Sequence, residues 1–229
     1  IGDASTDKYF NNLVYDDESN YTRYIFFYLS YLIENNRTED AKRIVGNLDY
    51  INTTLLLSQG KSWIENQNSK KLIDVFSCKN PNDIISEFLF LISNIYSSQD
   101  NFEKSNFYLN LSNFLNPKFV FNLSLVAENQ YLNGEYKKAK NTLKNFKKND
   151  KFYYWYRIKK ESQIIEKQRN KKESLNDIVL QFNKINQPNN RILFDIANFY
   201  KNSKEYSNSI KYNSKIIDSL DDDSEMKTD

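Results

Sequence analysis

Two neighbouring stretches of the chain share one spacing of small and bulky residues, and this internal repeat constrains the fold more than any other feature. The segments 86–119 and 120–151 align with small residues, Ser93 and Ala127, at the same place in their first halves. Ser105 and Ala139 match in the same way in the second halves. Two antiparallel helices pack closely only where a small residue lets one backbone approach the other. Each segment is therefore predicted to form a helical hairpin whose small residues belong to the core.

The same frame extends along the chain, with units that start near residues 22, 53, 86, 120, 152 and 190. The unit at 53 is weaker, and the unit at 152 is the most divergent because Lys159 and Lys171 stand where small residues are expected. We expect a distorted arrangement there, with an insertion of about four residues before Pro188. Four glycines and three prolines are too few for the turns of a β-sandwich or a Rossmann-type fold, whereas helices need few.

The residues of the 86–119 segment match the pattern of tetratricopeptide repeats, which have a period of about 34 residues. The matching positions are Leu89, Ile92, Ser93, Tyr96, Phe102, Ser105, Leu109, Ser112 and Pro117. The chain thus resembles the tetratricopeptide repeat family, in a divergent bacterial type. That resemblance implies an all-α protein, an α-α superhelix built as a right-handed solenoid of about six hairpins.

The resemblance also suggests a division of the chain into three parts. Residues 1–21 are expected to be a partial helical segment that packs on the first repeat, and residues 22–220 the repeat array. Residues 221–229 form an acidic tail. We expect the chain to be a fragment of a longer array or a processed mature protein.

In this family the first helix of each pair lines a concave groove where a peptide or helical segment of a partner binds. The corresponding positions here are Arg23, Phe26, Ser30, Glu34, Glu87, Phe90, Asn94, Ser98, Phe121, Ser124, Glu128, Tyr131, Tyr153, Tyr156, Lys160, Gln163, Arg191, Phe194, Asn198 and Lys201. Rigid aromatic rings and amides are favoured for partner contacts. The predicted binding residues are Phe26, Phe90, Asn94, Glu128, Tyr131, Tyr153, Tyr156, Phe194 and Asn198.

Catalytic chemistry finds little support in the sequence. The chain has no histidine and a single cysteine, Cys78, so histidine-dependent triads and thiolate metal cages are excluded. The glycines are isolated, so they cannot form a phosphate-binding loop. We therefore expect a non-enzymatic interaction scaffold with no cofactor, no metal and an unidentified protein or peptide partner.

Two other functions remain open. Single-stranded RNA binding is the first, because helical-hairpin arrays can read RNA and the chain has a dense basic stretch from Lys137 to Lys172. The lysines from Lys137 to Lys148, however, are expected on an outward-facing second helix, which indicates a solvated face. Nucleic acid is thus an unlikely partner. The second is a structural array in which copies join end to end. No stretch reaches the roughly 20 apolar residues that a membrane span needs. The resemblance is compatible with the bacterial cytoplasm or with the periplasmic, cell-envelope side.

Overall fold

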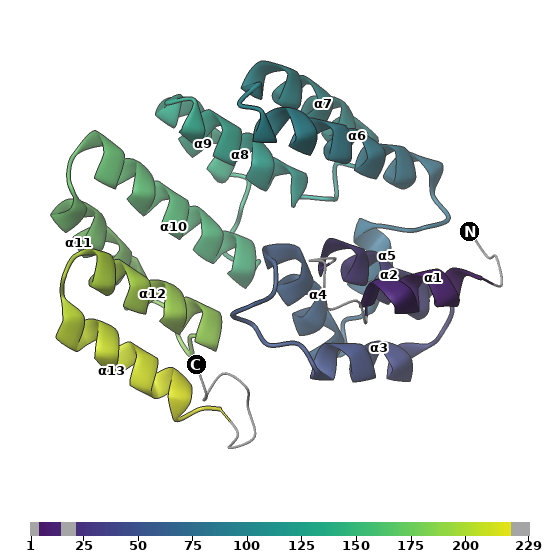
Figure 1. Cartoon of the computed structure of the whole chain (residues 1–229), viewed down its shortest axis with the longest axis horizontal. Coiled ribbons are helices and arrows are strands. Elements are labelled where there is room, and N and C mark those ends of the chain that lie inside the picture. Colours follow the sequence, from purple (N-terminus) through teal and green to yellow (C-terminus); the bar gives the residue numbers. More distant parts are fainter. Residues whose placement is uncertain (1–4, 15–21, 221–229) are drawn as a thin grey trace. The chain divides into compact units, whose positions relative to one another are not determined.

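The computed structural model describes residues 5–14 and 22–220, and these residues form α-helices joined by turns, with no β-strand among them. The predicted all-α class is confirmed for this part of the chain, while the acidic tail lies outside it. Figure 1 shows the helices, which are α1 (Thr6–Val14), α2 (Thr22–Glu34), α3 (Thr38–Gly46), α4 (Leu55–Glu65), α5 (Lys70–Val75), α6 (Pro81–Ser98), α7 (Phe102–Leu115), α8 (Asn122–Leu132), α9 (Tyr136–Leu143), α10 (Lys151–Gln168), α11 (Lys171–Phe182), α12 (Asn190–Asn202) and α13 (Tyr206–Ile217).

Many of these helices begin at a side chain that caps the free backbone N–H groups of the first turn. Such a cap contributes about 1 kcal/mol to helix stability. The capping residues are Thr54, Asn80, Asn101, Asp150, Asn170 and Asn189. The abundant asparagines of the sequence thus have a local structural role.

Five helix pairs are closed by the same backbone turn. Its central residue has a positive φ, between 57° and 75°, and is Asn36, Gln67, Asp100, Gly134 or Lys204. The amide of the next residue donates a hydrogen bond of 2.7–2.9 Å to the carbonyl five residues earlier. This is the Schellman motif, which satisfies the last free carbonyls of the first helix. The first helix of every such pair therefore ends in the same way, whatever residue occupies the turn.

Small residues make the contact between the helices of a pair, as predicted. The hydroxyl oxygens of Ser93 on α6 and Ser105 on α7 lie 3.0 Å apart, and both residues are buried. Ala127 and Ala139 take the same places in the α8–α9 pair and are also buried. In each pair the two residues are twelve positions apart in the sequence.

The α10–α11 pair keeps this spacing but is displaced by three residues from the predicted frame. Ser162 and Ser174, twelve positions apart, are both buried, and the Ser174 hydroxyl donates to the Ser162 carbonyl at 2.8 Å. Lys159 and Lys171, which the predicted frame placed at the contact, lie outside it. The unit thus begins near residue 155, and the insertion expected before Pro188 is unnecessary.

The chain divides into two compact units, residues 1–146 and 147–229. In the first unit, α2 packs against α1, α3, α4 and α5, and its buried side chains, such as Leu29 and Leu32, form the centre of that core. The α6–α7 pair packs against α8 in the same unit.

Two buried asparagines of α8 form hydrogen bonds with the preceding helix pair. The Asn122 amide donates to the Ser112 hydroxyl at 2.7 Å, and the Asn129 amide donates to Ser105 at 2.7 Å and to Asn106 at 3.0 Å. Because a buried amide without partners is costly, these bonds fix the register of α8 on α7.

In the second unit, α10 pairs with α11 and α12 with α13, while α11 also packs against α12. Ile158, Ile164, Ile178 and Ile196 are buried. None of the helices in the described part of the chain is both long and apolar enough to span a membrane.

Candidate functional site

Three of the predicted binding rings are buried, so the prediction that they face a ligand is wrong. Phe26 is fully enclosed between Phe27 and Phe119, with ring centroids 5.9 Å away in both cases. Phe90 packs on Phe121 and is also buried. A large apolar ring next to another helix is stabilised most by leaving water, which explains both positions.

Tyr153 is buried as well, and here the cause is the three-residue displacement of the α10–α11 unit. In the displaced frame this residue precedes the repeat. The corresponding groove positions become Tyr156, Lys159, Gln163, Glu166 and Lys167.

The other predicted residues reach the surface to different extents. Asn94 is exposed on α6, Glu128 and Tyr131 are half-buried on α8, and Tyr156 is half-buried on α10. Phe194 on α12 is exposed, and Asn198 on the same helix is half-buried. Asn198 also lines a pocket.

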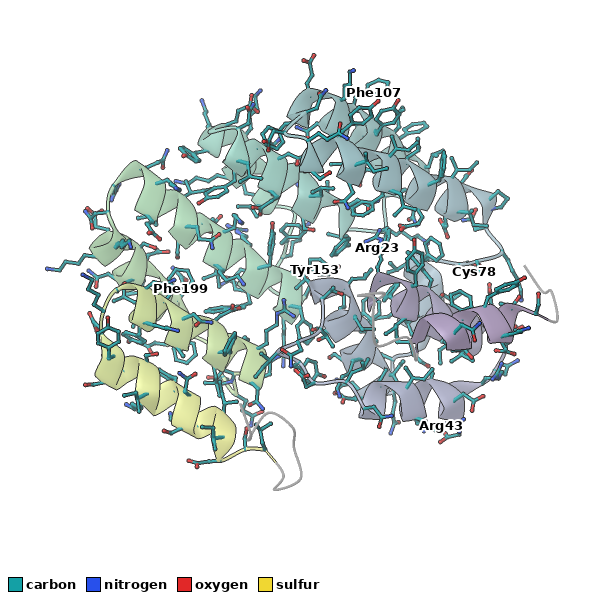
Figure 2. All side chains as sticks on the ribbon, viewed as in Figure 1. Arg23, Arg43, Cys78, Phe107, Tyr153 and Phe199 are labelled. Carbon is teal, nitrogen blue, oxygen red and sulfur yellow. The ribbon has the colours of Figure 1, made fainter. Side chains whose placement is uncertain are left out.

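That pocket lies in the second unit and has a volume of about 160 Å³. Its walls come from α10, the start of α11 and the end of α12, including Phe199, which Figure 2 labels. The lining residues are Lys159, Gln163, Glu166, Lys171, Ser174, Asp195, Asn198, Phe199, Asn202 and Ser203. Lys159, Gln163 and Glu166 occupy groove positions of the displaced frame, and Asn198 occupies one in the next pair.

One wall of the pocket is held rigidly by Asp195. Its carboxylate accepts a hydrogen bond of 2.8 Å from the Trp155 indole N–H and one of 2.9 Å from the Lys159 ammonium group. These bonds join α10 to α12 directly. The Lys159 charge is neutralised by this pair, so Lys159 does not act as a free cation for an incoming anion.

Three amide side chains line the pocket beside its charged residues. The side-chain oxygen of Gln163 is buried and accepts no hydrogen bond from any described residue. Asn198 and Asn202, one helical turn apart on α12, add two more amides. An unsatisfied buried acceptor costs about 1–3 kcal/mol, which a ligand N–H group would recover.

Sequence reasoning missed most of the lining residues, among them Asn202 and the two residues of α11, Lys171 and Ser174. The spacing of Asn202 from Asn198 was the available signal, since residues four apart share a helix face. The residues of α11 could not be recognised, because the predicted frame was displaced by three residues and placed Lys171 at the contact between the helices.

The structure also joins two predicted groove residues of different pairs, Arg23 on α2 and Glu87 on α6. The Arg23 Nε and Nη2 atoms lie 2.6 Å and 2.5 Å from the two carboxylate oxygens of Glu87. The guanidinium carbon also lies 3.8 Å from the centroid of the Phe90 ring and 4.8 Å from that of Phe121. Figure 2 shows Arg23 inside the first unit, where this pair connects α2 to α6.

The pKa of Glu87 is raised because burial penalises the charged carboxylate more than Arg23 stabilises it. Removal from water therefore opposes the attraction between the two groups. This buried pair has a structural role and offers no open face to a ligand.

Comparison of the chain with protein-family models, with curated proteins and with solved structures gave no match.

Proposed function

We propose that the chain is a tetratricopeptide-type interaction scaffold without enzymatic activity, and that it binds a peptide segment of a protein partner in the α10–α12 pocket. The observation that carries the proposal is the pocket that Gln163 lines together with Asn198 and Asn202, because the side-chain oxygen of Gln163 is buried and has no hydrogen-bond partner among the described residues. The shared hairpin turn and the twelve-residue spacing of small residues support the repeat assignment. In this proposal the helix pairs form a right-handed superhelix whose inner face contains the pocket.

The volume of the pocket limits what it accepts. Pockets that enclose a drug-sized ligand or cofactor typically measure about 300–1,000 Å³. A volume of about 160 Å³ is smaller and suits one side chain or a short piece of backbone. We infer that the pocket holds one anchoring residue while the rest of the peptide lies on the neighbouring surface.

The charge of the lining indicates the chemistry of that anchor. Two lysines, Lys159 and Lys171, are balanced by two carboxylates, Glu166 and Asp195. A net neutral lining rich in amides favours hydrogen-bond donors and acceptors over a single charged group. The anchor in this proposal is a main-chain amide or an asparagine or glutamine side chain that donates an N–H to Gln163.

A random peptide library selected on the purified chain tests this function. Asn198→Ala should weaken the selected peptides by about tenfold, the effect of losing roughly 1.4 kcal/mol of hydrogen bonding. Gln163→Leu should weaken them at least as much, because it removes the unpartnered acceptor. Circular dichroism would verify that both variants remain helical.

Asn94→Ala is the matched control, because Asn94 was predicted at the same groove position but lies on α6, outside the pocket. Its affinity for the selected peptides should equal that of the unmodified chain. The proposal fails if no peptide is enriched, or if binding survives both pocket changes.

A further inference from the structure

One side of α6 carries large apolar residues that no described part of the chain covers. We call this surface the head face, and it consists of Ile85, Phe88, Ile92 and Ile95. Ile85 is exposed, Phe88 is 61% exposed and Ile95 is 58% exposed, whereas Ile92 is half-buried. Exposed apolar groups gathered on one surface typically mark an interaction site.

The next pair shows what normally covers this side of a helix. A shift of 34 residues converts the head-face positions into those at the start of the α8–α9 pair. The residues found there, Phe119, Asn122, Val126 and Asn129, are all buried. Asn122 and Asn129 are buried against α7 of the preceding pair. The head face therefore matches a stacking surface, and none of the helix pairs in the described part of the chain covers it.

The last pair carries an open surface of the opposite kind. We call this surface the tail face, and it consists of Phe194, Tyr206, Ile210 and Ile217, all exposed. A shift of 104 residues relates these positions to Phe90, Phe102, Asn106 and Asn113 of the α6–α7 pair. Phe90 packs on Phe121 and Asn106 accepts a hydrogen bond from Asn129, so this is the side on which the following pair stacks.

The head and tail faces carry apolar residues at positions where the internal contact between pairs has polar residues. Inside the chain, Asn129 of one pair bonds to Asn106 of the other. The equivalent residues of the head and tail faces are Ile95 and Ile210. Both members of the pair are polar where the contact is internal, and both are apolar at the two open faces.

A second position shows the same change. Inside the chain, Asn122 bonds to Ser112 at 2.7 Å. The equivalent residues are Phe88, which is exposed on the head face, and Ile216, which is buried next to the exposed Ile217 of the tail face. The exposed apolar pair Ile95 and Ile210 stands where the internal contact has a polar pair, and Phe88 and Ile217 enlarge the apolar area on each face, so the two faces complement each other better than either would complement a polar surface.

We propose that the partner of the head face is the tail face of a second copy of this chain, stacked as α8 stacks on α7. This inference goes beyond peptide binding and uses residues outside the α10–α12 pocket. The contact joins two different surfaces, so each copy keeps one head face and one tail face. Such a heterologous contact produces a closed ring or an open chain of copies.

The test is light scattering coupled to size exclusion, from about 1 µM to about 1 mM chain, a range that covers weak and strong self-association. The average mass should rise above the 27.3 kDa of the single chain as the concentration increases. Phe88→Glu, which blocks the head face, should be monomeric throughout. Ile210→Glu, which blocks the tail face, should also be monomeric.

The decisive measurement is the equimolar mixture of these two variants. The Phe88→Glu chain retains a tail face and the Ile210→Glu chain retains a head face, so the mixture should form a one-to-one dimer and nothing larger. A mixture that stays monomeric would overturn the head-to-tail contact. So would an unmodified chain that remains monomeric at the highest concentration, in which case another protein or a further segment covers these faces.

Phe107→Glu provides a matched control. Phe107 is 59% exposed, nearly as much as Phe88, but Figure 2 shows it on the outer side of the α6–α7 pair. Its equivalent in the next pair, Asn141, is exposed. This variant should associate like the unmodified chain. If Phe88→Glu loses helicity, Ile95→Glu takes its place, and association that persists in a folded head-face variant would refute the proposal.

Discussion

The buried ion pair between Arg23 and Glu87 gives the sharpest prediction about stability. The Arg23 and Glu87 side chains are only 15% and 11% exposed, and both guanidinium-to-carboxylate hydrogen bonds are short. Two unit charges about 4 Å apart attract by roughly 4 kcal/mol at an effective dielectric constant of about 20. The attraction offsets a desolvation cost of several kcal/mol for each group.

From this balance we expect single and double substitutions to differ in a characteristic way. Arg23→Met or Glu87→Leu alone should lower the free energy of unfolding of the first unit by about 3–5 kcal/mol, because each leaves one buried charge without its partner. The double variant should come within about 1 kcal/mol of the unmodified chain, or exceed it, because neither charge remains. The difference between the stability change of the double variant and the sum of the two single-variant changes is the coupling energy of a double-mutant cycle.

The pH dependence separates the two single variants. The raised pKa of Glu87 means that the folded state binds a proton more readily than the unfolded state, so its contribution favours folding as the pH falls. The loss caused by Arg23→Met should therefore shrink between neutral and mildly acidic pH. The loss caused by Glu87→Leu should not shrink in this way, because an arginine stays charged throughout this range.

Urea unfolding followed by tryptophan fluorescence is the appropriate assay. The chain has two tryptophans, and Trp63 packs against the core of the first unit. A Trp155→Phe background removes the signal of the second unit. Single variants that cost less than about 1 kcal/mol, the value typical of an exposed pair, would refute this account. A double variant as unstable as either single variant would refute it equally.

Three further predictions concern a turn, a helix contact and the cysteine. Gly134→Ala should lower the free energy of unfolding by about 1 kcal/mol in urea titration, because φ there is +75°, whereas Gly46→Ala, with nothing within 4 Å of an added Cβ, should not lower it. Ala139→Lys should abolish hydrogen-exchange protection of α8 and α9, since it forces a charge between packed helices, while Ala139→Ser should preserve it. Burial raises the pKa of the Cys78 thiol from 9.0 to about 11. Its alkylation at pH 8 should therefore be about 100-fold slower than that of an unshifted thiol. The stability that this shift contributes should be lost as the pH rises from about 9 to about 11.

The sequence predicted the local part of the fold well. Close contact between two helices of a pair needs small residues at fixed positions, and Ser93, Ala127 and Ala139 are buried where the pattern placed them. In the α10–α11 unit the pattern was ambiguous, since Ser162 and Ser174 lie only three residues from the lysines that the frame selected. The distance between the two small residues, rather than the position of either, would have resolved it.

The candidate site was predicted less well, because the exposure of a helix pair depends on whether another pair stacks on it. Phe90 and Phe194 occupy the same position of the repeat, yet Phe90 is covered by Phe121 of the next pair and Phe194 is exposed. Nothing within one repeat distinguishes them. Likewise, Arg23 and Glu87 are 64 residues apart, and no local pattern predicts that they meet.

The recurring turn between paired helices shows that a backbone shape can repeat while its chemistry varies. Asparagine, glutamine, aspartate, glycine and lysine all adopt it, although a side chain makes a left-handed conformation costlier by about 1 kcal/mol or more. At the four turns with a residue other than glycine, packing of the flanking helices must offset this cost. The five turns therefore share one backbone conformation, although a different amino acid stands at the centre of each.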